Sequence, residues 1–186
     1  RNLVKADLRG IESHGVARLK RYTDGIKNGV VKVHPDIKVV RQSPVTALLD
    51  GDSGLGQVVS YKAMNMAIEK AKGNYVGLVG VRNSNHFGIA GFYGLMALEQ
   101  DLIGLVMTNT RPLVAHTFSK QKLVGTNPIC IAVPTRGRGF VLDMATSVAP
   151  IGKMEVAKRL GKKVPIGWGI DTDGNLTDDP MKVQIL

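Results

Sequence analysis

Apolar residues recur along the chain in two different periods, which predicts a protein that mixes helices and strands. The helical spacing of Val16, Leu19, Tyr22 and Ile26, ending near Gly29, predicts an amphipathic helix over residues 16–28. Further helices are predicted over residues 54–73, 89–100 and 150–163. Short apolar runs predict strands over residues 37–42, 45–51, 75–81, 102–109, 129–135 and 139–145. Because the two kinds of element are interleaved, the expected fold class is α/β (α+β).

Two glycine-containing segments resemble known binding loops only in part. The segment "GDSGLGQ", Gly51–Gln57, has the order G-x-x-G-x-G instead of the Rossmann order G-x-G-x-x-G, and no Walker lysine follows it. We interpret it as a tight turn before a helix. The segment "DTDGNLTDD" lacks the glycine and the glutamate that a calcium loop requires, so it predicts a hairpin turn around Asp173-Gly174.

The segment "DLRGIESHGVARL" gathers ionisable and polar side chains just before the first predicted helix. Ser13 is placed to cap that helix, and Gly15 holds His14 in a loop. Arg18 follows His14 by four residues, so one helical turn brings the two together. An arginine fork binds a carboxylate and an imidazole exchanges a proton near neutral pH. The alternative interpretation is a capped helix with a solvated basic face.

A second histidine lies in "NSNHFG", where an apolar strand ends and a helix begins. The carboxyl ends of strands in α/β sheets often carry reactive groups, and His86 is at such a place. Taken alone, His86 is better interpreted as a structural histidine that finishes a strand. No H-x-x-x-H spacing accompanies it, so the histidines do not predict a metal site.

Composition and charge limit the possible classes of protein. No run reaches the ~20 apolar residues of a membrane span, and the first residues lack the order of a signal peptide, so we expect a cytoplasmic protein. Cys130 is the single cysteine and has apolar neighbours, which suits an inert buried thiol. The net charge of +10 favours anionic ligands. Aromatic residues make up only 5%, which argues against a single-strand nucleic-acid binder.

Five ordered motifs together resemble one family. In chain order they are "ADLRGIESHGVARL", "NSNHFG", "TNTRPLV", "GTNPICIAVP" and "VLDMATS". This set is similar to the malate/L-lactate dehydrogenase family, which is distinct from the Rossmann dehydrogenases, and the similarity runs from about residue 3 to residue 180. The resemblance implies an oxidoreductase that uses NAD or NADP and acts on a small anionic 2-hydroxy or 2-oxo acid. It also implies a homodimer and a non-Rossmann, largely antiparallel cofactor-domain sheet flanked by helices.

The same resemblance implies roles for particular residues. The two active-site histidines of the family match His14 and His86, and its substrate-side motif matches Arg9, Ser13 and Arg18. The residues that match cofactor-contacting stretches are Thr110, Asp143, Met144, Ala145 and Thr146. We expect His14 to exchange the proton of the reacting hydroxyl and His86 to orient the substrate or act as an alternate base.

The resemblance also sets the expected domains and shows two departures. We expect a substrate-side region over residues 1–80 and a cofactor-binding domain over residues 81–186. After "TNTRPLVA" the chain reads "HTFSKQK" where the family has a proline and a glycine pair, so this loop is expected to differ. Family members continue beyond residue 186, so we expect a fragment of a longer protein. The alternatives are a non-catalytic basic module that binds nucleic acid or an acidic partner, and an inactive truncated member.

Overall fold

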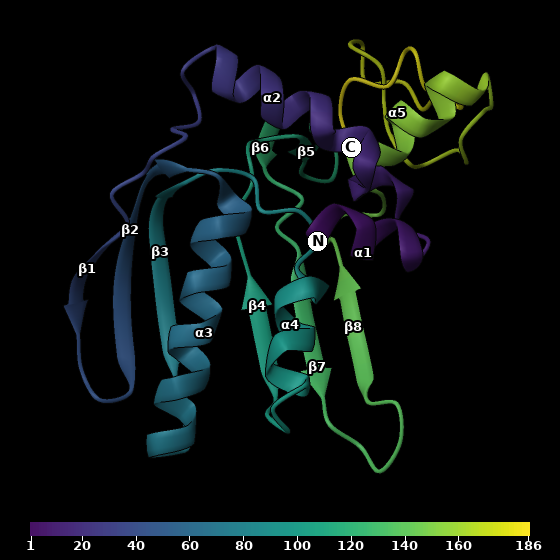
Figure 1. Cartoon of the computed structure of the whole chain (residues 1–186). Helices are drawn as coiled ribbons and strands as arrows, with labels where there is room; N and C mark the ends of the chain where they lie inside the picture. Colours follow the sequence, from purple (N-terminus) through teal and green to yellow (C-terminus); the bar gives the residue numbers. More distant parts are fainter. The chain divides into compact units, whose positions relative to one another are not determined.

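The computed structural model describes all 186 residues, which divide into two compact units (Figure 1). Unit 1 comprises Arg1–Val106 and Ile131–Leu142, and unit 2 comprises Met107–Cys130 and Asp143–Leu186. Helices and strands alternate along the chain and the sheets are open, which confirms the α/β (α+β) class. The predicted boundary at residue 80, between a substrate-side region and a cofactor-binding domain, concerns function and stays a prediction.

Unit 1 begins with short helices and continues into a three-stranded sheet. The helices are α1 (Asn2–Leu8), η1 (Glu12–His14), η2 (Val16–Arg18) and α2 (Leu19–Lys27); the sheet elements are β1 (Lys38–Gln42), β2 (Thr46–Gly54), α3 (Gly56–Asn74) and β3 (Leu78–Ser84). Strand β1 pairs antiparallel with β2, and β2 pairs parallel with β3. Helix α3 makes the crossover between β2 and β3 and packs along both strands (Figure 1). Because β2 and β3 are parallel, both carboxyl ends lie at the same edge of the sheet.

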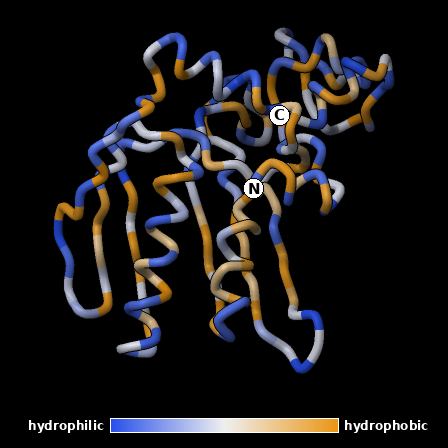
Figure 2. The backbone as a smooth tube through the Cα atoms, viewed as in Figure 1, coloured by the Kyte–Doolittle hydropathy of each residue, from blue (hydrophilic) through white to orange (hydrophobic).

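A second sheet has the strand order β4-β7-β8, with β4 at Gly104–Met107, β7 at Ile129–Val133 and β8 at Phe140–Met144. Apolar residues predominate along these strands (Figure 2). Helix α4 (Gly91–Leu98) lies close to β4, since a Cβ on Gly104 would come within 3.0 Å of the Ala97 side chain. In β4, Val106 is buried and Leu105 is exposed, as the twofold period of a strand requires.

Unit 2 contains a small hairpin, one helix and a compact apolar cluster. Strands β5 (Val114–Ala115) and β6 (Lys122–Val124) pair antiparallel. The segment "HTFSKQK", where this chain differs from the family pattern, forms the loop between them and ends at the first residue of β6. Helix α5 (Ile151–Leu160) supplies part of a core of buried apolar residues: Ala149, Met154, Ala157, Val164 and Val183. The predicted hairpin turn is confirmed, because Ile170 bridges Leu176 in antiparallel fashion and Gly174 has φ +91°.

Most predicted elements lie within a few residues of their observed bounds, and three details differ. The strand predicted from residue 75 begins at Leu78, because Tyr75 adopts a left-handed conformation (φ +66°) that ends α3. The helix predicted over residues 16–28 begins as the 3₁₀ turn η2 before it becomes α2. The glycine-rich segment Gly51–Gln57 was expected to be a tight turn before a helix, but its first four residues belong to β2 and only Leu55 separates that strand from α3. The strand is irregular there, because Asp52 and Ser53 are left-handed.

Candidate active site

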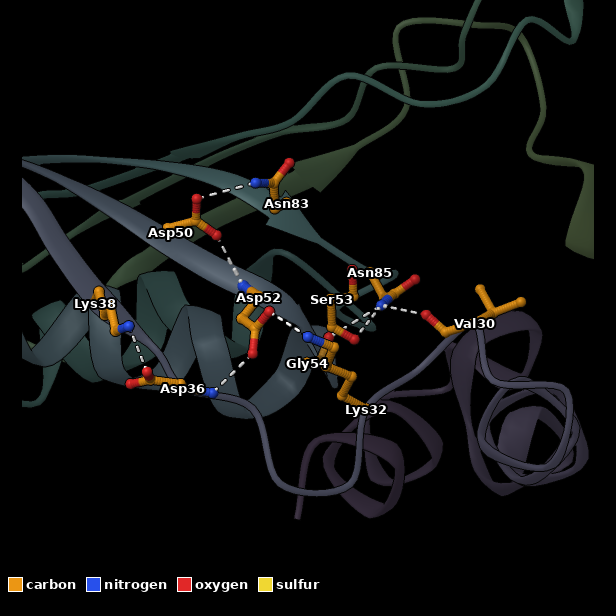
Figure 3. A network of polar contacts seen from close by, with 10 residues as sticks. All are labelled: Val30, Lys32, Asp36, Lys38, Asp50, Asp52, Ser53, Gly54, Asn83 and Asn85. Atoms are coloured by element: carbon orange, nitrogen blue, oxygen red, sulfur yellow. Dashed lines mark hydrogen bonds and ion pairs between the residues drawn. The ribbon is translucent and has the colours of Figure 1, made fainter.

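The loop that carries His86 follows β3 and is fixed from the side of β2. The side-chain amide of Asn85 donates to the carbonyl oxygens of Ser53 at 2.9 Å, Gly54 at 3.1 Å and Val30 at 3.4 Å (Figure 3). Two residues earlier, the amide of Asn83 donates to the Asp50 carboxylate at 2.9 Å. These bonds hold the end of β3 in place, so the two asparagines of "NSNHFG" position the histidine that follows them.

The same loop is fixed from its other side by Asn2 in α1. The buried Asn2 amide donates to the Phe87 carbonyl at 3.1 Å and accepts from the Ile89 amide at 3.3 Å. The Tyr93 hydroxyl of α4 also donates to the Phe87 carbonyl, at 2.6 Å. Gly88 has φ +83°, and a Cβ there would overlap the Asn2 side chain. Only glycine fits this turn.

The segment that carries His14 is fixed by Arg18 and Asp7. The Arg18 Nε donates to the Ser13 carbonyl at 2.7 Å, and the Val16 amide donates to the Asp7 carboxylate at 2.9 Å. The prediction that Ser13 caps the following helix is wrong: the α2 N-cap is Arg18, with no side-chain cap. Ser13 lies inside η1 instead, and its hydroxyl is 2.9 Å from Nδ1 of His14.

These two segments bring the predicted histidines together. The rings of His14 and His86 stack with centroids 5.5 Å apart and planes inclined by 18°. The Tyr22 hydroxyl of α2 lies 2.7 Å from Nδ1 of His86. Both rings are partly buried, and they are 72 residues apart in sequence, so only the fold places them side by side.

The hydrogen bonds of His86 determine its tautomer. The backbone amide of Gly88 lies 3.3 Å from Nδ1 and can only donate. Nδ1 of the neutral ring is therefore an acceptor, and the Tyr22 hydroxyl donates its proton to it. The remaining proton of the neutral imidazole lies on Nε2. His86 thus offers an N–H group as a donor to a bound molecule.

Burial and two arginines keep both imidazoles neutral at neutral pH. Burial lowers the pKa of His14 to about 4, and the positive charges of Arg18 and Arg21 contribute in the same direction. Burial lowers the pKa of His86 to about 3, with further contributions from Arg21, His14 and Arg18. Perturbed ionisable groups of this kind are typical of functional sites.

The structure brings two unpredicted residues to this site and leaves one predicted residue aside. Arg21 and Tyr22 lie with the histidines, whereas Arg9 is exposed at the end of α1, and the arginines that lower the two imidazole pKa values are Arg18 and Arg21. The spacing from Arg18 contains a signal for both missed residues. Arg21 and Tyr22 lie three and four residues after Arg18, on the same helical face.

The residues predicted to contact the cofactor lie in unit 2, where two of them share a partner. The Thr126 amide donates to the Thr110 hydroxyl at 2.8 Å, and the Thr146 amide donates to the Thr126 carbonyl at 2.9 Å. The Thr110 amide donates to the Asn127 side chain at 2.9 Å. Asp143 and Met144 end β8, and Ala145 joins them to Thr146. Thr110 and Thr146 are thus joined through their common partner Thr126.

Other candidate features do not coincide with the histidines. A cavity of about 360 Å³ lies between α1, α3 and α4, and neither histidine lines it. No group of three or more His, Cys, Asp or Glu side chains is placed to hold a metal ion. Cys130 is buried, as expected. None of the helices combines the length and the apolar character that crossing a membrane would need.

Comparisons with known proteins agree on one family. The sequence profile described as malate/L-lactate dehydrogenase matches residues 1–185. Malate dehydrogenase of Pyrococcus abyssi is 61% identical over 176 residues, which cover 95% of this chain and 49% of that protein. L-sulfolactate dehydrogenase of Methanocaldococcus jannaschii is 50% identical over 179 residues, covering 96% and 52%.

A solved structure shows the same relation in three dimensions. Malate dehydrogenase from Pyrococcus horikoshii OT3 matches with a TM-score of 0.87 at 54% identity, covering 100% of this chain and 51% of that one. The chain therefore spans about half the length of the relatives that it matches. Because the family profile covers nearly every residue, the chain belongs to the malate/L-lactate dehydrogenase family.

Proposed function

We propose that this chain carries the substrate site, and part of the cofactor site, of an NAD(P)-dependent oxidoreductase. The reaction is reversible hydride transfer between the nicotinamide and C2 of a small 2-hydroxy acid or 2-oxo acid. The stacked pair of neutral imidazoles beside two guanidinium groups carries the proposal. The relatives named for malate and sulfolactate support a substrate with a second acidic group.

The arginines are proposed to bind the carboxylate of the substrate. Arg18 is oriented by its bond to the Ser13 carbonyl, and with Arg21 it makes the surroundings of both imidazoles positive. A planar guanidinium can bind a carboxylate through two parallel hydrogen bonds, which fixes the orientation of the acid. Arg9 and Ser13 remain secondary candidates, Ser13 acting through His14.

The two histidines are proposed to have different roles at the reacting oxygen of the substrate. Nε2–H of His86 donates a hydrogen bond to that oxygen. His14 donates its Nδ1–H to the Ser13 hydroxyl, which leaves Nε2 free to accept the hydroxyl proton during oxidation and to return it during reduction. A bound carboxylate offsets the charges of Arg18 and Arg21, so substrate binding raises the pKa of His14 and makes it a better base.

The residues of unit 2 are proposed to bind the cofactor. NAD or NADP, when bound, supplies the hydride chemistry. Thr110 and Thr146, joined through Thr126, present hydroxyl and backbone groups to it, together with Asp143, Met144 and Ala145. We also propose that the protein acts as a homodimer in the cytoplasm.

A cofactor screen tests this function. Full-length protein is mixed with NADH or NADPH and a panel of 2-oxo acids that includes oxaloacetate, pyruvate and 3-sulfopyruvate, and the loss of reduced cofactor is followed. We expect at least one dicarboxylate-like acid to be reduced faster than pyruvate. Absence of turnover, with tight salt-sensitive binding of DNA or RNA instead, would favour a basic binding module.

A further inference from the structure

The segments that carry the two histidines share one feature: each contains a glycine whose missing side chain leaves room for a residue of α1. A Cβ on Gly88 would overlap the Asn2 side chain, and a Cβ on Gly15 would overlap the Asp7 carboxylate. Gly15 has an extended backbone (φ −81°, ψ −156°) that other residues also adopt, so the space that Asp7 occupies is what requires glycine there. One helix therefore lies directly against both segments.

Asp7 caps the helical segment that follows His14. Its carboxylate accepts a hydrogen bond from the Val16 amide at 2.9 Å. Val16 begins η2, which runs on into α2, and neither helix has a side-chain cap from its own N-cap residue. The first amides of a helix have no partner inside it, so Asp7 supplies from α1 the acceptor that the local sequence lacks. The segment capped in this way carries Arg18 and Tyr22.

Asn2 holds the other segment from the opposite end of α1. Its amide uses both polar atoms, donating to the Phe87 carbonyl and accepting from the Ile89 amide. Asn2 and Asp7 are five residues apart, a rise of roughly 7.5 Å along an α-helix. The centroids of the stacked imidazoles are 5.5 Å apart, which is a similar distance.

We propose that Asp7 and Asn2 are positioning residues, through which α1 holds His14 and His86 against each other. Asp7 fixes the backbone after His14, and Asn2 fixes the backbone after His86, so both act without touching the substrate. The inference rests on the proposed function of the histidines, since a fixed pair of rings matters for a reaction in which both contact the same oxygen.

Substitutions at Asp7 test its role in turnover. Asp7→Ala removes the carboxylate, whereas Asp7→Asn keeps its shape and one acceptor oxygen for the Val16 amide. With the 2-oxo acid found in the screen, we expect kcat/KM of full-length Asp7→Ala to fall roughly tenfold or more, and Asp7→Asn to stay within about threefold of the wild type. Glu69→Ala, which removes an exposed acid from α3, is the matched control.

NMR titration of the histidine rings in the full-length protein gives a readout that needs no turnover. His14 faces Arg18 of η2, Arg21 of α2 and the ring of His86, and burial beside these groups lowers its pKa to about 4. Releasing the ring in Asp7→Ala should raise that pKa by about one unit or more, toward the ordinary value of about 6.5. Loss of a nearby negative charge without any movement would lower the pKa instead, so the direction separates positioning from charge.

Two further variants test the contacts from other sides. Asn2→Ala should raise the pKa of His86, which is about 3 in the wild type, and should lower kcat/KM as well. Gly15→Ala places a Cβ where the Asp7 carboxylate lies, so it should act like Asp7→Ala. In the Asp7→Ala background the overlapping atoms are gone, so the same methyl group should change kcat/KM by less than about twofold.

Two results would overturn the inference while the proposed function stands. One is an Asp7→Ala variant with the His14 pKa and the kcat/KM of the wild type, because a loss of stability alone would make Asp7 a structural residue only. The other is an equal effect of Gly15→Ala in both backgrounds. An unchanged His86 pKa in Asn2→Ala would contradict the role of Asn2. If the wild type turns over no 2-oxo acid but the titrations give the expected shifts, the proposed function fails and the positioning of the rings by α1 stands.

Discussion

The imidazoles of His14 and His86 carry protons only in acid, because burial and two guanidinium groups favour their neutral forms. Without a ligand the protein therefore presents uncharged rings throughout the neutral range. This has a consequence for stability as well as for catalysis. In the unfolded chain the rings are solvated and the arginine charges are no longer beside them, so the pKa of each histidine lies near the ordinary value of about 6.5.

Stability should fall on acidification because of these two rings. Their folded pKa values lie near 4 and 3, below the unfolded value, so the unfolded chain binds more protons between about pH 6.5 and about pH 4. The free energy of unfolding should drop by at most about 4 kcal/mol between about pH 7 and about pH 5. The drop is smaller than this limit because both rings are partly exposed, and solvent screens the charges around them. Denaturant unfolding at several pH values measures it.

The matched variants isolate the histidine contribution. The double variant His14→Gln/His86→Gln should show a shallower dependence on pH, whereas His34→Gln, at an exposed position, should follow the wild type. Equal slopes for the double variant and the wild type would mean that the two rings are not neutral in the folded state.

Tyr22 is expected to position His86 through Nδ1. Replacing it with Phe removes the 2.7 Å hydrogen bond to His86, so the imidazole ring is no longer held in one orientation. We expect a loss of roughly tenfold in kcat with little change in KM, because one neutral hydrogen bond contributes about 1 kcal/mol. Steady-state kinetics of the full-length variant measure this. A raised KM with kcat unchanged would instead place Tyr22 in substrate binding alone.

At this scale the sequence predicts residue types better than their partners. His14, His86 and Arg18 were identified from short motifs, and the structure brings them together. Tyr22 was counted as an apolar residue of an amphipathic helix, because helical periodicity does not show that its hydroxyl meets a ring 64 residues away. The sequence also predicts Ser13 as a helix cap. That prediction fails because the Ser13 hydroxyl lies against the ring of its neighbour His14 instead.

Helix α3 and the His86 loop are coupled at the start of the helix, where Gly56 lies against the Asn85 and His86 carbonyl oxygens. The same helix contains Gly73 near its end, where an added Cβ would meet nothing within 4 Å. One helix thus offers a test position and a control position for the same substitution.

The two glycines should respond to alanine in opposite directions. Gly56→Ala forces the helix away from the loop and should cost about 1–3 kcal/mol, together with a lower kcat as His86 moves. Gly73→Ala should stabilise by about 0.5–1 kcal/mol, because alanine loses less backbone entropy in a helix. Denaturant unfolding and steady-state kinetics measure both. A harmless Gly56→Ala would contradict the close contact between α3 and the loop.

Elements with a strong apolar period were predicted well, and short ones were not. Helix α3 and strands β7 and β8 lie close to their expected bounds, because long periodic runs dominate the signal. Helix α1 and the β5–β6 hairpin were missed. Strands of two and three residues have no measurable period, and α1 is held by Asn2, whose partners lie 85 or more residues away.

At the scale of the whole chain, the net charge of +10 should attract the anionic acid and the dinucleotide. Added salt shortens the screening length, so kcat/KM for both ligands should fall several-fold between about 0.05 M and about 0.5 M NaCl. A kcat/KM value independent of salt would mean that the positive charge is spread over a surface with no part in binding.

The family follows from the order of five motifs over nearly the entire chain, and the mixed fold class follows from the interleaved helical and strand periods; the family profile and the structural match support both. The substrate cannot be chosen from these motifs, because malate, lactate and sulfolactate share the 2-hydroxycarboxylate that Arg18 would hold. The division into two compact units was not visible either. Each unit is built from two separate segments of the chain, so no local pattern marks its bounds.

The proton role of His14 is tested most directly by the turnover of His14→Asn in the full-length protein, beside His116→Asn at an exposed position. Asparagine keeps a polar group at the site but cannot exchange a proton. With the 2-oxo acid found in the screen, kcat should fall by roughly 100-fold or more, while the dissociation constant for NADH stays within about twofold of the wild type and the control keeps full turnover. Turnover of His14→Asn within about twofold of the wild type would contradict the assignment.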